Sequence, residues 1–197
     1  MQFLWKLIII TLLSSTVLSA QTKTQKIGTV EISGYSEMTI TKTQVILSGP
    51  RVEIKTKDGT LGAKASKIVL TFATGAAPGG IGSLKTASLS GNVWLLIRRD
   101  SDRITEATSN NADVDLTESR QAVLSGNVII KTTDPSLFVG PMSVTADKAT
   151  ISLKPDAQMQ PGEPRIKVES DPGRSRIEFT PKSQEKTGGE KSGFEKS

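Results

Sequence analysis

The sequence predicts an all-β protein built from repeated pairs of short strands. Apolar and polar residues alternate at period two, as in Val30-Glu31-Ile32, and Gly and Pro interrupt the chain at short intervals. The tripeptide Leu-Ser-Gly also occurs three times. After the first 20 residues we find no sustained apolar stripe of helical period, so we expect little helix there. The length of 197 residues is enough for one ordinary domain or two small ones.

The first segment has the layout of a secretory signal peptide. Lys6 precedes the apolar run Leu7–Leu13, and the small residues Ser19 and Ala20 follow it. The run is shorter than the roughly 20 apolar residues of a spanning helix, so cleavage is favoured over a retained anchor. We therefore expect a signal helix over residues 1–20, an exported domain over residues 21–180 and a polar, disordered tail over residues 181–197.

The repeated unit has two halves. The first begins at Leu47-Ser48-Gly49, Leu89-Ser90-Gly91 and Leu124-Ser125-Gly126, and each copy leads into an apolar strand. Gly at this step suits a bulge or a bend where a strand crosses between sheets. The second half covers residues 63–70, 109–116 and 146–153, which we align without gaps on their final Leu. Stacked copies of such a unit bury a shared apolar face that a single hairpin leaves exposed.

The remaining elements complete an all-β pattern. Residues 29–32 and 37–40 read as strands separated by a turn at Gly34. Residues 155–164 contain three prolines and read as an irregular linker. Residues 165–168 and 176–179 flank Asp171-Pro172-Gly173, which predicts a final hairpin.

Composition excludes several classes of chemistry. The chain contains no Cys and no His, which excludes disulfides, thiol nucleophiles, Cys-ligated zinc and Ser-His-Asp triads. The net charge of +5 is scattered along the chain, which gives nucleic-acid binding little support. One acidic set lacks the spacing of a calcium loop: it comprises Asp100, Asp102, Glu106, Asp113, Asp115 and Glu118. We therefore expect no enzyme, no cofactor and no metal.

The aliphatic residues of the repeated strands are the candidate binding residues. They are Val93, Leu95, Ile97, Val128, Ile130, Ile68, Leu70, Ile151 and Leu153. Each either lines a lipid-binding groove or belongs to an ordinary closed core, because every sheet needs a buried face. Trp94 points to the opposite face, at a rim or in packing. Arg98, Arg99 and Arg103 either meet a phosphate or form a solvated turn with neighbouring aspartates.

The strand motifs resemble a known family. Leu124-Ser-Gly-Asn-Val-Ile-Ile-Lys, followed by Val144-Thr-Ala-Asp-Lys-Ala-Thr-Ile-Ser-Leu, resembles the signature of the LptA/OstA-like family, whose members are periplasmic lipopolysaccharide-transport proteins. Leu89-Ser-Gly-Asn-Val matches as well. The first copy departs at Pro50-Arg51, and the second has Asn110-Asn111 in place of Ala-Asp.

The resemblance implies a fold and a function. The fold would be an antiparallel half-jellyroll, and its apolar groove would carry lipopolysaccharide or a similar amphipathic glycolipid from the inner to the outer membrane. The implied location is the periplasm. The implied partners are LptC-like and LptD-like jellyroll proteins joined by edge-strand pairing, or further copies of the chain joined head to tail. The alternatives are an exported structural β-solenoid without a lipid ligand and, less favoured, a carbohydrate-processing enzyme.

Overall fold

The computed structural model describes residues 25–27, 30–74, 81–171 and 174–181. These residues form one antiparallel sheet of eleven strands, in the order β1-β2-β4-β5-β6-β7-β8-β9-β10, with β3 beside β4 and β11 beside β9. The all-β prediction is confirmed. The predicted signal helix, and the predicted tail beyond residue 181, lie outside the described residues. The strands are β1 (Gln25–Ile27), β2 (Val30–Ser33), β3 (Glu37–Ile40), β4 (Gln44–Thr56), β5 (Leu61–Thr74), β6 (Ile81–Arg98), β7 (Ile104–Asp115), β8 (Gln121–Thr133), β9 (Met142–Ser152), β10 (Ile166–Glu169) and β11 (Arg176–Glu178), and one short 3-10 helix, η1, spans Asp156–Gln158.

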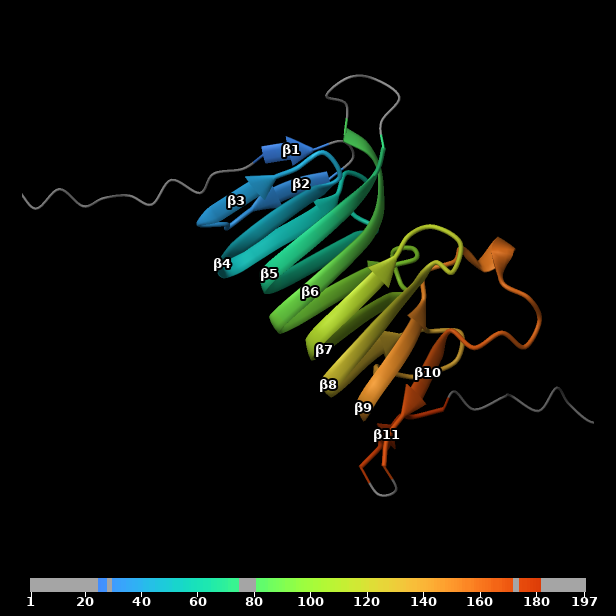
Figure 1. The fold of residues 1–197 in the computed structure, drawn as a ribbon. Helices are drawn as coiled ribbons and strands as arrows, with labels where there is room; N and C mark the ends of the chain where they lie inside the picture. The colour runs from blue at the N-terminus through green and yellow to red at the C-terminus, as the bar shows by residue number, and fades with distance from the viewer. Residues whose placement is uncertain (1–24, 28–29, 75–80, 172–173, 182–197) are drawn as a thin grey trace, which may run out of the picture.

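The strands stack in chain order along one axis. β1, β2 and β3 lie at one end of the stack, and β10 and β11 lie at the other (Figure 1). The six strands from β4 to β9 are long, from 11 to 18 residues, and each pairs with the next strand in the chain. The predicted stack of strand pairs is therefore a meander whose neighbours in sequence are neighbours in space.

The long strands β6 and β8 bend near the middle, at the residues of the repeated motif. Gly91 and Asn92 have φ of 78° and 50°, and Gly126 and Asn127 have φ of 76° and 51°. The pairing register shifts at the same places. Gly and Asn tolerate this left-handed backbone better than other residues, so Gly-Asn turns the strand without ending it. The predicted bend at Leu-Ser-Gly is thus present in the second and third copies.

The first copy makes its bend in another way. Gly49 is followed by Pro50, which lacks the backbone N–H needed for a ladder hydrogen bond. The buried residues Leu47 and Val52 are one position further apart than Leu89 and Val93 in the second copy. The extra residue forms an irregularity in the β4–β5 register. This explains why the first copy departs from the Gly-Asn pattern.

The bends lie close to one another across neighbouring strands. A Cβ on Gly49 would lie 2.9 Å from the carbonyl oxygen of Gly34, and a Cβ on Gly126 would lie 2.7 Å from Nδ2 of Asn110. At Gly49 the neighbouring atoms are backbone, which cannot give way, so a residue without a Cβ is required there. The aligned bends divide the sheet into two layers. Layer A contains residues before the bends of β4, β6 and β8 and after those of β5, β7 and β9, and layer B contains the other halves.

Our alignment of the second halves is wrong for the first copy. Lys67 pairs with Ser48, as Asn111 pairs with Ser90 and Lys148 pairs with Ser125. Phe72 therefore occupies the position of Leu116 and Leu153, and Leu70 occupies the position two residues earlier. The alignment on a final Leu shifted the first copy by two residues, because its last apolar residue is Phe72 and not a leucine.

The predicted turn at Gly34 and the predicted final hairpin are also corrected. β2 pairs with layer B of β4, and β3 pairs with layer A of β4. Gly34 is therefore the bend of an interrupted strand that lies along β4. At the opposite end, β10 and β11 pair with the two halves of β9. At each end of the stack an interrupted strand thus follows the bend of its inner neighbour, and β1 adds a further strand outside β2. The predicted irregular linker over residues 155–164 is present apart from η1.

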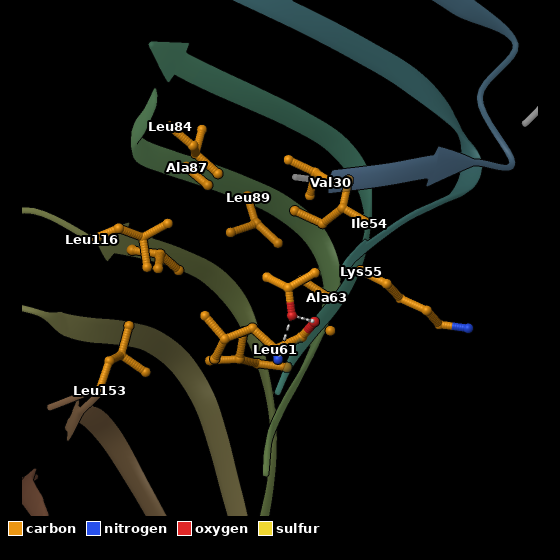
Figure 2. A pocket seen from close by; sticks show the side chains of 14 residues that line it. Val30, Ile54, Lys55, Leu61, Ala63, Leu84, Ala87, Leu89, Leu116 and Leu153 are labelled. Carbon is orange, nitrogen blue, oxygen red and sulfur yellow. Dashed lines mark hydrogen bonds between the residues drawn. The ribbon is translucent and has the colours of Figure 1, made fainter. Parts of the chain in front are cut away.

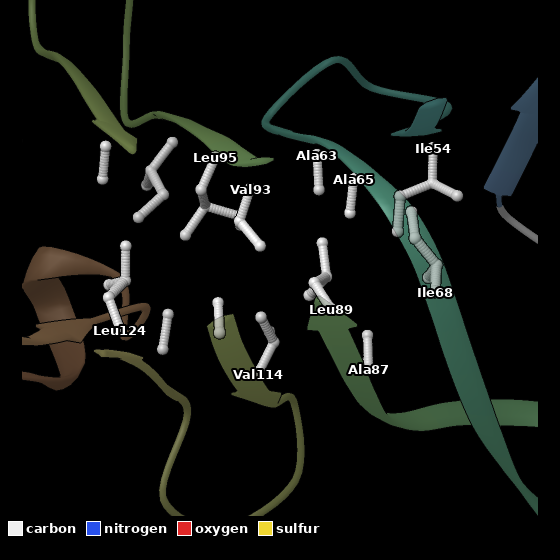
Figure 3. Close-up of a cluster of buried hydrophobic side chains, with 14 of the residues drawn as sticks. Ile54, Ala63, Ala65, Ile68, Ala87, Leu89, Val93, Leu95, Val114 and Leu124 are labelled. Atoms are coloured by element: carbon white, nitrogen blue, oxygen red, sulfur yellow. The ribbon is translucent and has the colours of Figure 1, made fainter. Parts of the chain in front are cut away.

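The core lies between the two layers. Side chains from before and after the bends face each other: Val93, Leu95, Ala63 and Ala65 from layer B lie opposite Leu89, Ala87, Val114 and Leu124 from layer A (Figure 3). Burial of one Val, Leu or Ile side chain contributes about 1.5–3 kcal/mol. The folded sheet therefore forms its core with itself and needs no second element to cover its apolar face.

Candidate functional site

The candidate aliphatic residues all come from strands that line the interior. Eight of the nine are 5% exposed or less, and Leu153 is half-buried against the same core. Val93, Leu95 and Ile97 are on layer B of β6, and Val128 and Ile130 are on layer B of β8. Ile68 and Leu70 on β5 and Ile151 on β9 face them from layer A. The structure therefore brings the set together, and Leu95 and Leu153 also reach a pocket between the layers.

This pocket is apolar and narrow. Its free space is about 40 Å³, whereas sites for small ligands usually offer about 300–1,000 Å³. Side chains of both layers surround it (Figure 2). The interior is thus filled with protein, and a ligand chain needs the layers to separate. The lining residues are Val30, Ile54, Lys55, Thr56, Leu61, Gly62, Ala63, Leu84, Ala87, Leu89, Leu95, Val114, Leu116 and Leu153.

Four half-buried leucines at strand ends line this pocket, and we call them the leucine seam. Leu61 begins β5 in layer B, whereas Leu84, Leu116 and Leu153 lie near the free ends of β6, β7 and β9 in layer A. The two layers are joined at the bends, and the strand ends away from the bends face each other across an opening that we call the mouth. The leucine seam closes one stretch of this mouth. Sequence analysis included only Leu153. Leu116 carried a usable signal, because it occupies the same position of the repeat as Leu153.

The next stretch of the mouth is closed by ions. Arg99 follows layer B of β6, and its guanidinium donates hydrogen bonds to the carbonyl oxygens of Ser152 (2.8 Å) and Lys154 (2.7 Å) and to Oδ1 of Asp156 (3.2 Å). Arg103 donates to the other oxygen of Asp156, and Nη2 of Arg165 lies 3.3 Å from Oδ1. We call these four residues the arginine clasp. It joins the two free edges across the mouth.

Electrostatics keep the clasp charged at neutral pH. The hydrogen bond from Arg103 lowers the pKa of the Asp156 carboxyl, and the charges of Arg165, Arg103 and Arg99 lower it further against the opposing effect of desolvation. Burial lowers the pKa of the Arg99 guanidinium, and the charge of Asp156 opposes that shift. An arginine remains protonated in such surroundings, so Asp156 faces three cations.

The clasp lies between two hollows. One hollow, of about 210 Å³, has an apolar wall that includes Ile97, Met142, Ile151 and Ile166, together with Arg99, Arg103 and Arg165. The other, of about 490 Å³, is lined by Leu61, Leu153 and a polar rim that includes Arg99, Arg103, Arg120 and Asp156. Cationic groups therefore stand beside apolar surface at this end of the mouth.

The structure also shows the contacts of Trp94 and of the acidic residues that the sequence analysis singled out. The Nζ of Lys64 lies 4.8 Å from the ring centroid of Trp94, a cation–π arrangement on the outer face. Asp100 accepts a hydrogen bond from Nε of Arg103 at 2.6 Å. Hydrogen bonds from Ser119 and Thr117 lower the pKa of Asp115 to about 2. Across the described residues, Asp and Glu side chains form no group suited to a metal ion.

The arrangement defines a class of fold. It is an open antiparallel jellyroll whose two layers share a continuous aliphatic interior. No helix within the described residues is long and apolar enough to cross a membrane.

Comparison with known proteins places the fold more specifically. No family model and no curated protein matches the sequence. Among solved structures, the fold matches the crystal structure of LptH, described as the LptA homologous periplasmic component of the lipopolysaccharide transport device of Pseudomonas aeruginosa. The TM-score is 0.54, the sequence identity is 12%, and the match covers 77% of this chain and 93% of LptH. At this identity the likeness establishes an LptA-like fold.

Proposed function

We propose that this protein binds the acyl chains of an amphipathic lipid between its two layers and carries that lipid across the periplasm. Lipopolysaccharide or a similar glycolipid is the proposed ligand. The observation that supports this most is an aliphatic interior that reaches the leucine seam at the mouth of a folded sheet. The described transport role of LptH, which has the same fold, supports the same proposal.

The energetics favour acyl chains as ligands. Each CH₂ group removed from water contributes about 0.8 kcal/mol, so burial of a long acyl chain opposes the free-energy cost of separating the layers. The leucine seam is held by apolar contacts, which an entering chain replaces with contacts of the same kind. The core residues proposed to contact the chain are Val93, Leu95, Ile97, Val128, Ile130, Ile68, Leu70, Ile151 and Leu153.

The ends of the stack fit the proposed partners. β10 and β11 lie along β9 at one end, and β1 lies outside β2 at the other. Edge strands present unpaired backbone groups that recruit further strands. We propose that LptC-like and LptD-like jellyrolls, or further copies of this chain, pair with these edges and extend the interior.

One substitution tests the lipid site with a matched control. Ala87 is 3% exposed and lines the pocket, whereas its neighbour Thr86 is exposed on the outer face of the same strand. Ala87→Phe fills the pocket and should weaken binding of a fluorescent fatty-acyl probe at least about tenfold, because overpacking and lost space oppose chain entry. Thr86→Phe should leave probe binding unchanged.

A second candidate function rests on a specific observation. The free space between the layers is only about 40 Å³, which also fits a closed structural protein of the envelope. That candidate predicts no acyl probe binding by the unmodified protein. Titration of the unmodified chain with the probe, monitored by fluorescence and native mass spectrometry, distinguishes the two functions.

A further inference from the structure

The arginine clasp places three guanidinium groups around a single carboxylate, which is more positive charge than one ion pair across the mouth would need. We propose that Arg99, Arg103 and Arg165 form a binding site for the phosphate group of an amphipathic ligand, and that Asp156 occupies this site until the ligand displaces it. The inference rests on the proposed function, because it assigns the ligand's polar end to a place at the mouth where its acyl chains enter.

The geometry is that of an occupied anion site. Three guanidinium groups from two parts of the chain converge on the two oxygens of one carboxylate. Arg99 and Arg103 flank the turn between β6 and β7, and Arg165 precedes β10. Planar guanidinium forks match the oxygens of phosphate as well as those of carboxylate, and phosphate offers more oxygens and more charge.

The largely buried guanidinium of Arg99 needs a neighbouring anion to compensate its charge. Its side chain is only 14% exposed, and its other hydrogen-bond acceptors are the neutral carbonyl oxygens of Ser152 and Lys154. A cation withdrawn from water is costly unless an anion compensates its charge. If Asp156 leaves, a second anion therefore has to take its place beside Arg99.

The other two arginines keep a second carboxylate each. Arg103 also pairs with Asp100, and Arg165 lies 3.5 Å from Oδ2 of Asp134. These carboxylates orient both guanidinium groups while Asp156 exchanges with a ligand. Asp134 is 8% exposed and is itself fixed by hydrogen bonds from the backbone N–H and hydroxyl of Ser136.

The surface beside the clasp suits the rest of an amphiphile. The hollow lined by Ile97, Ile151 and Met142 also contains the three arginines, so alkyl groups and a phosphate fit side by side. An isolated site for inorganic anions would not need this apolar wall.

Asp156 lies in the connection between β9 and β10. It begins η1 within residues 153–165, which connect β9 to β10 and which we call the strap. Lys154 is tied to Glu163 within the strap at 2.6 Å, so this pair does not hold the strap to the layers. Displacement of Asp156 by a phosphate therefore removes the main ionic tie between the strap and the β6–β7 turn.

The binding test compares two ligands on three proteins. The ligands are a single-chain alkyl phosphate and the uncharged alcohol with the same chain. We expect the unmodified protein to prefer the phosphate, and Asp156→Asn to bind it about tenfold more tightly, the effect of one charge-assisted hydrogen bond. Glu169→Gln removes an exposed carboxylate on β10 and should change neither affinity.

The outcomes separate this inference from the proposed function. Equal binding of phosphate and alcohol, unaffected by Asp156→Asn, would overturn the phosphate site and leave the lipid-binding function intact. Binding of neither ligand would overturn both. Inorganic phosphate, tested alone, should bind much more weakly than the alkyl phosphate, and equal affinity would contradict an amphiphile as the ligand.

A second measurement needs no variant. Hydrogen exchange of the strap in the unmodified protein should accelerate when the alkyl phosphate is added, because Asp156 no longer holds η1 at the mouth. The uncharged alcohol should leave strap exchange unchanged. Slower strap exchange with the phosphate would contradict displacement of Asp156.

Discussion

The two stretches of the mouth are closed by opposite kinds of interaction. At the leucine seam, half-buried side chains of Leu61, Leu84, Leu116 and Leu153 meet over an apolar pocket. At the arginine clasp, three guanidinium groups meet Asp156. Apolar contact is non-directional and is not screened by salt, whereas ion pairs are directional and respond to pH and ionic strength. One fold therefore combines an apolar closure at one stretch of the mouth with an ionic closure at the next.

Replacing Arg99 should disrupt the arginine clasp and cause the largest loss of unfolding free energy among the substitutions in the clasp. Arg99→Met keeps an unbranched apolar stem but leaves Asp156 and two backbone carbonyls without this donor, so we expect a loss of about 2–3 kcal/mol in unfolding free energy. Urea titration measures it. Arg98→Met is the matched control: Arg98 is exposed, and its replacement should change stability by less than about 0.5 kcal/mol.

A smaller effect should appear as the pH falls. The pKa of Asp156 is lowered in the folded protein by Arg103, Arg165 and Arg99, with Asp100 and Asp134 as the other carboxylates beside these arginines. A depressed carboxyl pKa contributes stability that is complete above the unfolded value near 3.8 and is lost as pH falls through the lower folded value.

The leucine seam contains no titrating group, but other carboxyls with a lowered pKa, such as Asp58 and Asp115, also contribute to the acid loss of stability. The difference between the unmodified protein and Asp156→Asn therefore isolates the contribution of Asp156. Asp156→Asn should flatten the stability profile below pH 4, by less than about 1 kcal/mol because the carboxyl is partly exposed. Thermal unfolding in a pH series measures the difference. An unchanged acid limb in Asp156→Asn would show that Asp156 carries none of this dependence.

The sequence predicted the interior better than it predicted the mouth. Period-two alternation around Leu89–Ile97 identified inward-facing residues because every second residue of a strand points to one face. The Gly-Asn steps at Gly91 and Gly126 predicted bends because few other residues adopt that backbone. Both signals are local, so they can be read within a few residues.

The features that sequence analysis missed depend on contacts far apart in the chain. Asp156 lies more than fifty residues from Arg99 and Arg103, in a proline-rich linker that has no strand pattern. β10 and β11 were misread as a hairpin for the same reason, because both take their positions from β9. Leu61 and Leu84 have no distinctive neighbours in sequence, and they become a seam only when the layers fold over each other.

The most direct test of the central claim locates a bound acyl chain. A fatty acid with a photoreactive group within its alkyl chain is bound to the unmodified protein and irradiated, and mass spectrometry identifies the labelled residues. We predict label on the leucine seam and on interior residues such as Leu95, and its loss in Ala87→Phe. Label confined to the outer face, at Trp94 or Leu96, or no label at all, would contradict binding between the layers.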